Sequence, residues 1–476
     1  MDVARRQDLS VIDPHSLTHR QKTLALATLI IALVLEIVDM TIVNTALPAI
    51  KASLGADAQA SQWIVAGYSL AFAVLLMAGG RLGDTFGYRR MFLVGITGFT
   101  LASAACGLAH TGTALVAARL LQGATGAVMA PQAMAMVQVM FSPLERVSRM
   151  ALFGVIGGLA AIAGPVLGGL LIEANLFDLG WRAVFLINLP VGVGAVIAGL
   201  VFLPEARSGR PAGYDLVGMA LFGLAMAALL HPLIGAAETG HGGAMLWPLV
   251  AVVPLGVLAW RHAGKRVRAG RPALFDPALF TIASFRQGLA LAIVFGAVGA
   301  GFLLVFAFAM QAERGQTPLF TGLLHVPYGL GAMFGIGVMS RNLLPRLGRW
   351  VLVLGAGVML PATALVLWGI TMAHLPWLAV GLCLMLAGAG MGMTSGCVGP
   401  VVVSRVDRDH AGAASALLKT SQQFGAALGV ALVGSLYFAA GARAFAPPAM
   451  AALAVIAALQ LACIGLAWRL PHRLFD

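Results

Sequence analysis

Two carboxylates lie three residues apart in one of the most apolar stretches of the chain, LVLEIVDMTIVNTALP (33–48). Glu36 and Asp39 share one face if this stretch is helical, because residues i and i+3 are neighbours on a helix surface. Acids this close titrate as a coupled pair, and burial with a nearby cation tunes when a carboxyl group takes up a proton. A charge facing lipid is costly, so both should face the interior. The pattern predicts a proton-binding site at Asp39. Glu36 is a second protonation site, a negative charge for a cationic ligand, or a hydrogen-bonded spectator.

A second group of polar side chains begins at Arg119, in the stretch RLLQGATGAVMAP. Arg119, Gln122, Gly123 and Gly126 fall on one helical face at i, i+3, i+4 and i+7. An arginine a turn or two inside an apolar segment should face the bundle interior, although its side chain could instead snorkel to the outer surface. Asp39 could then be a structural carboxylate locked onto Arg119, a role that does not exclude proton binding.

Two further ionisable residues, His325 and Lys419, lie within apolar segments. A lone histidine either packs as a hydrogen-bonded core residue or lines a binding site. Lys419 lies about two turns from a segment end, where it could snorkel. If it faces a cavity instead, it favours an anion or pairs with a carboxylate, which weakens the case for a cationic ligand. Tyr328 is among the aromatic residues that could line a cavity for flat apolar compounds.

The composition is that of an integral membrane protein. The chain has 476 residues, of which 60% are hydrophobic and 10% charged, with a mean hydropathy of +0.93. Soluble domains carry about 25% charged residues. The four cysteines fall within apolar runs, without metal-ligand spacing, so we expect core residues and no metal or cofactor. There is no phosphate-binding loop and no hydrolase motif, so we expect no enzyme and no ATP-driven pump.

The apolar runs predict fourteen membrane helices, and the positive charges predict their orientation. With both termini cytoplasmic, most of the 30 Lys and Arg residues fall in inside segments. Outside segments then hold only Lys51, Arg182, Arg314 and Arg443. The basic character is therefore topological and indicates no nucleic-acid partner. The expected span centres lie near residues 36, 71, 100, 126, 161, 193, 226, 252, 299, 331, 360, 388, 428 and 458.

Two polar breaks divide the chain into six spans, an inserted pair and six more. PEARSGRPAGYD (204–215) follows the sixth expected span, and RHAGKRVRAGRPALFDP (261–277) follows the eighth. The expected parts are a cytoplasmic tail, a six-helix bundle, a two-helix hairpin with flanking cytoplasmic loops, a second six-helix bundle and a short tail. They cover residues 1–22, 23–203, 204–280, 281–470 and 471–476.

The loop GRLGDTFGYRR (80–90) has a weaker counterpart in RNLLPRLGRW (341–350). Aligning Gly87 with Gly348 places Pro345 opposite Asp84, so the second copy lacks the acid. Parallel six-helix repeats with a substrate site between them are a known transporter architecture. The first loop closely resembles the signature loop between the second and third spans of the major facilitator superfamily. The resemblance implies a cytoplasmic gating loop, although Thr85 and Tyr88 stand where that family usually has basic residues. Its residues are Gly80, Gly83, Asp84, Gly87, Arg89 and Arg90.

The fifth expected span carries GVIGGLAAIAGPVLGG (154–169), whose small residues four apart suit close helix packing. Its GPxxGG core resembles the antiporter motif of the same superfamily, which implies a hinge at Gly164, Pro165, Gly168 and Gly169. With GWRAVFLINLPVG, RPALFDPALFTIASF, QAERGQTPLFTGLLHVPYG and GAASALLKTSQQFGAALGVALVG, the chain resembles the fourteen-span drug:proton antiporters from about Thr23 to Leu470.

This resemblance implies an all-α membrane protein of the major facilitator fold, a monomer in the bacterial inner membrane. It would exchange protons for amphipathic drugs across the lipid bilayer. Glu36, which stands where the family usually has an apolar residue, favours cationic drugs. Proton coupling is expected at Asp39, Glu36 and Arg119. Substrate contacts are expected at Glu36, Asp39, Asn44, Gln122, His325 and Tyr328. Within the same fold, the alternative is a dedicated exporter of one metabolite, peptide or siderophore. A membrane sensor or scaffold would belong to a different class, and no soluble signalling domain supports it.

Overall fold

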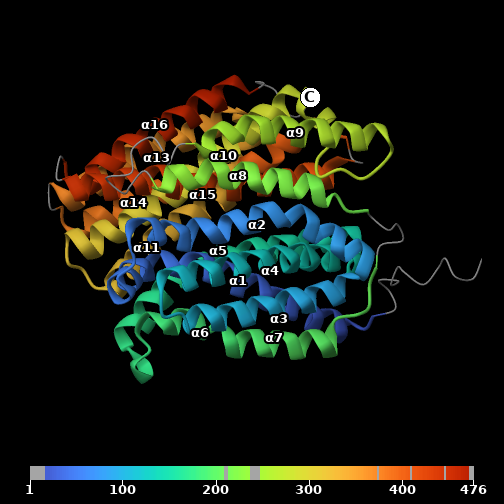
Figure 1. Ribbon diagram of the computed structural model, residues 1–476, viewed down its shortest axis with the longest axis horizontal. Helices are drawn as coiled ribbons and strands as arrows, with labels where there is room; N and C mark the ends of the chain where they lie inside the picture. Colours follow the sequence, from blue (N-terminus) through green and yellow to red (C-terminus); the bar gives the residue numbers. More distant parts are fainter. Residues whose placement is uncertain are drawn as a thin grey trace, which may run out of the picture.

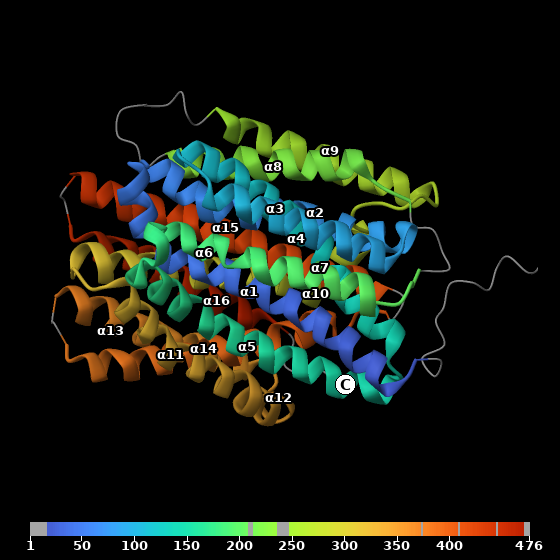
Figure 2. The same cartoon turned by 90° about the horizontal axis from the view of Figure 1, so that it is seen from below.

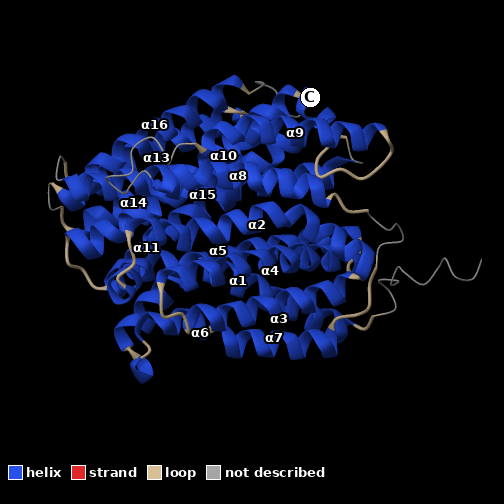
Figure 3. Ribbon diagram, viewed as in Figure 1, coloured by secondary structure: helices blue, strands red, loops and turns tan. Residues whose placement is uncertain are grey.

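The structure is a bundle of long, nearly parallel and antiparallel helices (Figures 1 and 3). The computed structural model describes residues 17–207, 213–235, 247–372, 375–407, 410–443 and 446–470, and within these ranges it contains helices and turns but no strand. Hydrocarbon offers no hydrogen-bond partners to a backbone, so membrane segments this apolar must satisfy their N–H and C=O groups internally. The expected all-α class is confirmed. The expected tail at 471–476 and most of the one at 1–22 lie outside the described residues.

The first half consists of six membrane-length segments whose starts are set by local caps. Thr18, Asp57 and Thr111 each accept a hydrogen bond from a backbone N–H in the first turn of the following helix. The first helix begins at His19, four residues before the expected start of the bundle. The elements are α1 (His19–Leu54), α2 (Ala58–Phe86), α3 (Tyr88–Gly107), α4 (Gly112–Met140), α5 (Pro143–Ala174), η3 (Leu176–Asp178), η4 (Gly180–Arg182), α6 (Ala183–Leu186) and α7 (Asn188–Phe202).

The second half has the same number of long segments, and an α-helical hairpin lies between the halves in the chain. The hairpin consists of α8 (Leu216–Gly235) and α9 (Pro248–Arg268). It lies at one edge of the bundle, where α8 packs beside α2 (Figure 2). The remaining elements are η6 (Pro277–Thr281), α10 (Ala283–Phe308), η7 (Ala309–Glu313), α11 (Pro318–Phe334), η8 (Gly335–Ser340), α12 (Arg341–Leu347), α13 (Trp350–Thr371), α14 (Trp377–Val403), α15 (Ala411–Arg443) and α16 (Pro448–Arg469).

Thirteen of the described helices are long and apolar enough to cross a membrane. The fourteenth expected span, centred near residue 252, corresponds to α9, which does not reach the same apolar length. Its last turn carries Lys265, Arg266 and Arg268, and residues 236–246 before it lie outside the described ranges. The count of fourteen spans and the cytoplasmic termini therefore remain predictions.

The two halves meet along two seams, α2 against α15 and α5 against α11. The second seam depends on glycine. A Cβ on Gly169 of α5 would collide with the backbone of Pro318 and Leu319, and a Cβ on Gly322 of α11 would collide with the carbonyl of Pro165. These contacts lie at the end of the bundle where α5 ends and α11 begins. The small residues of the GPxxGG motif therefore let the two helix backbones touch there.

Candidate functional site

A buried ion pair lies at the centre of the first half. Arg119 Nη1 of α4 donates to Asp39 Oδ2 of α1 at 2.6 Å, and the two residues are 1% and 0% exposed. The sequence predicted that Asp39 and Arg119 face inward, and the structure brings them into direct contact. Snorkelling of Arg119 to the outer surface is wrong, because the guanidinium lies fully inside the bundle.

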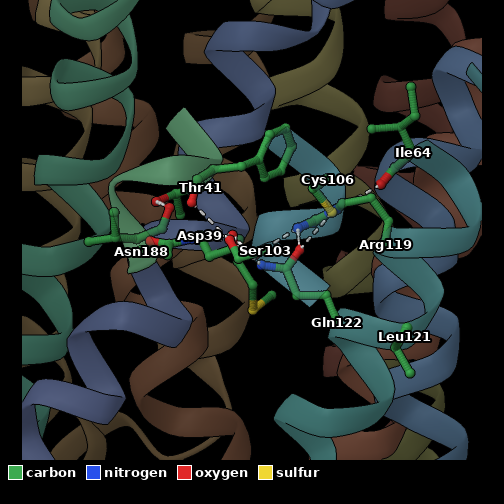
Figure 4. A network of polar contacts seen from close by, with 12 residues as sticks. Asp39, Thr41, Ile64, Ser103, Cys106, Arg119, Leu121, Gln122 and Asn188 are labelled. Carbon is green, nitrogen blue, oxygen red and sulfur yellow. Dashed lines mark hydrogen bonds and ion pairs between the residues drawn. The ribbon is translucent and has the colours of Figure 1, made fainter. Parts of the chain in front are cut away.

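Two amides complete the shell of the Asp39 carboxylate (Figure 4). Gln122 Nε2 and Asn188 Nδ2 donate to Asp39 Oδ1 at 2.7 and 2.8 Å. Both amides also contact the Ser103 hydroxyl, at 3.2 and 2.9 Å, and that hydroxyl donates to the carbonyl of Phe185. Four helices, α1, α3, α4 and α7, therefore meet at one carboxylate. A buried charge is tolerated when such hydrogen bonds replace water.

Arg119 is held by partners besides Asp39. Its Nε donates to the Ile64 carbonyl at 3.1 Å, and its Nη1 donates to Gln122 Oε1 at 2.7 Å. The guanidinium carbon lies 4.4 Å from the centre of the Tyr68 ring, which adds a cation–π contact. These partners remain available to Arg119 if the Asp39 carboxylate loses its charge.

Sequence reasoning missed Asn188 and Ser103. The signal for Asn188 was present, because it is the lone amide in the apolar run AVFLINLPVG, where an unsatisfied amide would be costly. Ser103 gave no usable signal, since a serine in a membrane helix commonly bonds its own backbone. Its role depends on α3 lying beside α4 and α7.

The second acid, Glu36, has a partner of its own. Lys419 Nζ of α15 lies 3.8 Å from Glu36 Oε1, and it also lies 5.4 Å from the centre of the Phe72 ring. Glu36 is 4% exposed, whereas the lysine side chain is 48% exposed. Both residues line a small pocket of about 30 Å³ with α4 residues such as Met129. Of the alternatives for Lys419, the structure shows pairing with a carboxylate. This pairing weakens the argument for a cationic ligand.

A larger cavity of about 250 Å³ lies between the two halves. The first half contributes residues of α1 and α5, and the second half contributes residues of α10, α11, η8 and α14. Its lining is Thr41, Asn44, Gly158, Ala161, Pro165, Leu303, His325, Tyr328, Gly329, Ala332, Met333, Ile336, Met391, Gly392 and Ser395. None of these carries a carboxylate or an amine.

The structure divides the six expected substrate contacts among three places. Asn44, His325 and Tyr328 line the cavity. Asp39 and Gln122 lie in the buried ion-pair cluster and do not line it, while Glu36 lies in the small pocket with Lys419. Helix α1 links these places, because it presents Asp39 to the first half and Thr41 and Asn44 to the cavity.

The expected hinge lies against the same helix. A Cβ on Gly164 of α5 would collide with the Thr41 side chain, and a Cβ on Gly168 would press on Ile42. Pro165, which interrupts the hydrogen bonding of α5, also lines the cavity. The antiporter motif thus contacts α1 next to the proton-site candidate, and contacts α11 through Gly169.

The expected gating loop is a tight turn between α2 and α3. Gly87 has φ +95° and Gly348 has φ +54°, so both aligned positions use backbone that favours glycine. Asp84 accepts a hydrogen bond from the hydroxyl of Tyr88 at 2.8 Å, so the residue that departs from the family pattern is the one that binds the acid.

The basic pair of this loop is split between two environments. Arg89 pairs with Glu205 at 2.6 Å, which fastens the start of α3 to the segment after α7, whereas Arg90 is exposed. Gly83 lies buried against Gln132 and Tyr88, and Gly80 lies near Pro131 of α4. The loop is therefore tied to the first half through α3, α4 and the end of α7.

Asp215, within the first polar break, is a buried carboxylate that sequence reasoning did not single out. It accepts hydrogen bonds from the backbone N–H groups of Gly218 and Leu274, each at 2.9 Å, and lies 2.7 Å from His262 Nε2. Burial alone would raise the pKa of Asp215. The two backbone bonds and His262 outweigh that effect and hold it below its ordinary value of 3.8. Asp215 thereby joins α8, α9 and the linker before α10.

Comparison with known proteins identifies the family to which this chain belongs. Residues 29–430 match the model of the Major Facilitator Superfamily. The chain belongs to that superfamily. The fold agrees: a bacterial homolog of the human lysosomal transporter Spinster has a TM-score of 0.66 at 15% identity, over 96% of this chain and 98% of that one.

This chain is similar in sequence to drug and antibiotic efflux transporters. The "Probable actinorhodin transporter" of Streptomyces coelicolor is 38% identical over 427 residues, which cover 87% of this chain and 72% of that protein. The "Tetracenomycin C resistance and export protein" of Streptomyces glaucescens is 35% identical, over 84% of this chain and 72% of that one. The "Multidrug resistance protein Stp" of Mycobacterium tuberculosis is 32% identical, over 88% and 76%. The expected resemblance is confirmed, and the chain is a multi-pass membrane transporter.

Proposed function

We propose that this transporter is a proton-coupled antiporter that exports amphipathic, drug-like compounds across the bacterial inner membrane. The observation that carries the proposal is the Asp39–Arg119 pair, a fully buried titratable group inside the bundle, 2.6 Å from its cation. An intramembrane ionisable residue of this kind marks a functional site by default. One chain completes both the Asp39 cluster and the cavity, so we propose that it works as a monomer.

In this mechanism the proton binds to Asp39 from one side of the membrane and leaves to the other. Protonation removes the charge that holds Arg119 Nη1. Arg119 then keeps Gln122, the Ile64 carbonyl and the Tyr68 ring as partners. The proton therefore changes how tightly α1 is held to α4 without leaving the arginine unpartnered.

Coupling to the cargo is indirect, because Asp39 does not line the cavity. Helix α1 carries Asp39 and also Thr41 and Asn44, which do line it. A shift of α1 on protonation would move those two residues and press on Gly164 of α5. Rocking of the halves about the α5–α11 seam would then expose the cavity alternately to the two sides.

The contacts between the halves indicate which side is closed. Gln311 Nε2 donates to the Thr45 carbonyl at 2.9 Å, and Ser435 donates to Gln62 Oε1 at 3.1 Å. Both contacts lie at the end of the bundle where α1 ends and α2 begins. With the termini in the cytoplasm this is the outer end, which we propose is the closed one in this arrangement.

The proton gradient supplies enough energy for this exchange. One proton moving inward through about 100 mV releases roughly 2.3 kcal/mol, and each pH unit adds about 1.4 kcal/mol. Together these correspond to a concentration ratio on the order of several hundred. No ATP-binding motif is required.

The deciding experiment is Asp39→Asn in proteoliposomes loaded with a fluorescent drug. We expect the acceleration of efflux by an imposed proton gradient to disappear, while Asp57→Asn at the cap of α2 keeps it, because asparagine caps a helix equally well. Unchanged gradient-driven transport by Asp39→Asn would overturn the proposal.

The single variant leaves the buried Arg119 charge without a carboxylate, and its neutral partners Gln122, the Ile64 carbonyl and the Tyr68 ring keep the loss of stability below the roughly 3–5 kcal/mol of a fully unpaired buried charge. A second variant, Asp39→Asn with Arg119→Gln, removes both charges and avoids this cost. It should fold, bind drug and show no response to the proton gradient.

A dedicated exporter of one metabolite is the second candidate function. It is supported by similarity to the probable actinorhodin transporter and to the tetracenomycin C export protein, each named for one compound. Susceptibility tests of an expressing strain against a panel of unrelated dyes and antibiotics, with and without a protonophore, distinguish the two. Protection against one structural class alone would favour the dedicated exporter.

A further inference from the structure

The central cavity is an uncharged site, and two of its lining residues each have one polar side-chain atom without a partner. Tyr328 Oη and His325 Nε2 are buried and make no hydrogen bond among the described residues. Both residues belong to α11 and line the cavity, with exposures of 9% and 5%. At i and i+3 they share one face of the helix. Unpaired buried polar atoms are costly, so each such group in a folded protein needs an explanation.

The hydrogen bond of His325 Nδ1 determines whether Nε2 of the same ring is a donor or an acceptor. Nδ1 lies 2.8 Å from the carbonyl oxygen of Thr321, which can only accept, so Nδ1 carries the proton. In the neutral ring Nε2 is then an acceptor. Tyr328 offers a hydroxyl that both donates and accepts. The pair therefore suits a ligand with one hydroxyl or N–H donor and one neighbouring acceptor.

Aromatic contacts hold the two rings at the cavity wall. The His325 ring lies edge-on to Phe306 with centroids 5.1 Å apart, and the Tyr328 ring lies 6.0 Å from Phe302. Both polar atoms are shielded in this arrangement, so a ligand reaches them when the side chains that cover them move aside. Such a movement keeps the hydrogen bond from Nδ1 to Thr321 that makes Nε2 an acceptor.

The charges around the cavity are already balanced by protein partners. The cavity lining contains no carboxylate and no amine. The nearest acids along α1 are Asp39, paired with Arg119, and Glu36, paired with Lys419. A cation entering the cavity would lose its water without gaining an anionic partner. The remaining wall carries Thr41, Asn44 and Ser395 among alanine, glycine, proline, methionine and branched aliphatic residues, and its largely apolar surface suits a flat apolar body.

From this geometry we propose that the cargo is an uncharged polycyclic compound that carries a free hydroxyl group and a carbonyl group, bound through His325 Nε2 and Tyr328 Oη. The proposal rests on the export function above and names the class of compound exported. The hydroxyl of the ligand donates to His325, and the hydroxyl of Tyr328 donates to the ligand carbonyl. The volume of about 250 Å³ is slightly below the usual range of roughly 300–1,000 Å³ for ligand pockets, which limits the cargo to a few fused rings.

The test measures binding to the purified transporter in nanodiscs without a proton gradient, so its outcome does not depend on proton coupling. The probes are 2,6-dihydroxyanthraquinone, whose hydroxyls cannot reach its own carbonyls, anthraquinone, which lacks the two hydroxyls, and ethidium, a permanent cation. We expect wild-type protein to bind the dihydroxy compound most tightly. Tyr328→Phe and His325→Phe should each weaken that binding about three- to tenfold and leave anthraquinone binding unchanged.

Tyr214→Phe is the matched control, because the Tyr214 hydroxyl is likewise buried without a partner but lies far from the cavity, next to α8. It should bind all three probes as the wild type does. Ethidium binding as tight as that of the dihydroxy compound would overturn the proposal. An equal loss of affinity for both anthraquinones in Tyr328→Phe would also overturn it, because that result would indicate altered packing of the cavity wall.

Discussion

Lys419 Nζ lies 3.8 Å from Glu36 Oε1, and this ion pair joins helix α15 of the second half to helix α1 of the first. Glu36 therefore has a cation beside it in the small pocket that both residues line. The two acids of LVLEIVDM share a helix face, yet each has its own cation, Arg119 for Asp39 and Lys419 for Glu36. The negative charge that would attract a cationic drug is neutralised from the opposite half.

Removing Lys419 should make the transporter bind cations better. In Lys419→Met the Glu36 carboxylate loses its partner, so ethidium affinity should rise about two- to fivefold at mildly alkaline pH, in keeping with the modest worth of a half-exposed ion pair. Fluorescence titration measures the change. The double variant Lys419→Met with Glu36→Gln should return ethidium affinity to the wild-type value. An increase that persists in the double variant would show that Glu36 is not the cause.

Asn188 should be needed for the proton-dependent step. Asn188→Leu removes one of the donors to Asp39 Oδ1, a hydrogen bond to a charged group worth about 1.5–3 kcal/mol. We expect a lower unfolding temperature and at least tenfold slower gradient-driven efflux. Gln460→Leu is the control, because Gln460 is an equally buried amide in the second half that bonds Thr363 and no carboxylate. Gln460→Leu should lower stability and keep the response of efflux to the proton gradient. If Gln460→Leu lost that response as much as Asn188→Leu, Asn188 would have no specific part in the proton-dependent step.

The α5–α11 seam should tolerate no side chain at Gly169. In Gly169→Ala the new Cβ meets the backbone of Pro318 and Leu319, and such overpacking costs about 1–3 kcal/mol. Closure at this end should be impaired, with slower transport and a lower unfolding temperature. Gly154→Ala in the same helix has open space around the new Cβ, so it should transport normally and gain a little helix stability. Normal transport by Gly169→Ala would show that the seam opens freely.

Asp215 should contribute stability that is lost in acid. Its folded-state pKa lies below 3.8, so its contribution is fully present above that ordinary value and disappears as the pH falls through the lowered one. Asp215→Asn should therefore lower the unfolding temperature near neutral pH, through weakened bonds worth about 1.5–3 kcal/mol each to Gly218 and Leu274. The difference from the wild type should shrink below about pH 4. A difference that is constant across this range would show that the carboxylate charge is not involved.

Much of the fold could be predicted from local sequence, because membrane helices are defined by apolar length and by the need to pair their own backbone groups. The expected segment centres near residues 36, 126 and 458 fall inside α1, α4 and α16. The exception is α9, where apolar and basic residues adjoin in one helix. Local hydropathy does not reveal where such a helix lies relative to a membrane surface.

The sequence by itself determined which side chains share a face. Helical periodicity placed Glu36 beside Asp39 and aligned Arg119 with Gln122, and burial cost required them to point inward. Tertiary structure alone decided their partners. Asn188, Ser103 and Lys419 lie far along the chain from Asp39 and Glu36, and only the packing of α3, α7 and α15 brings them within reach. Periodicity gives the direction of a side chain, whereas its charge balance depends on which helix lies opposite. That is why the predicted charge of the cargo changed once the structure was known.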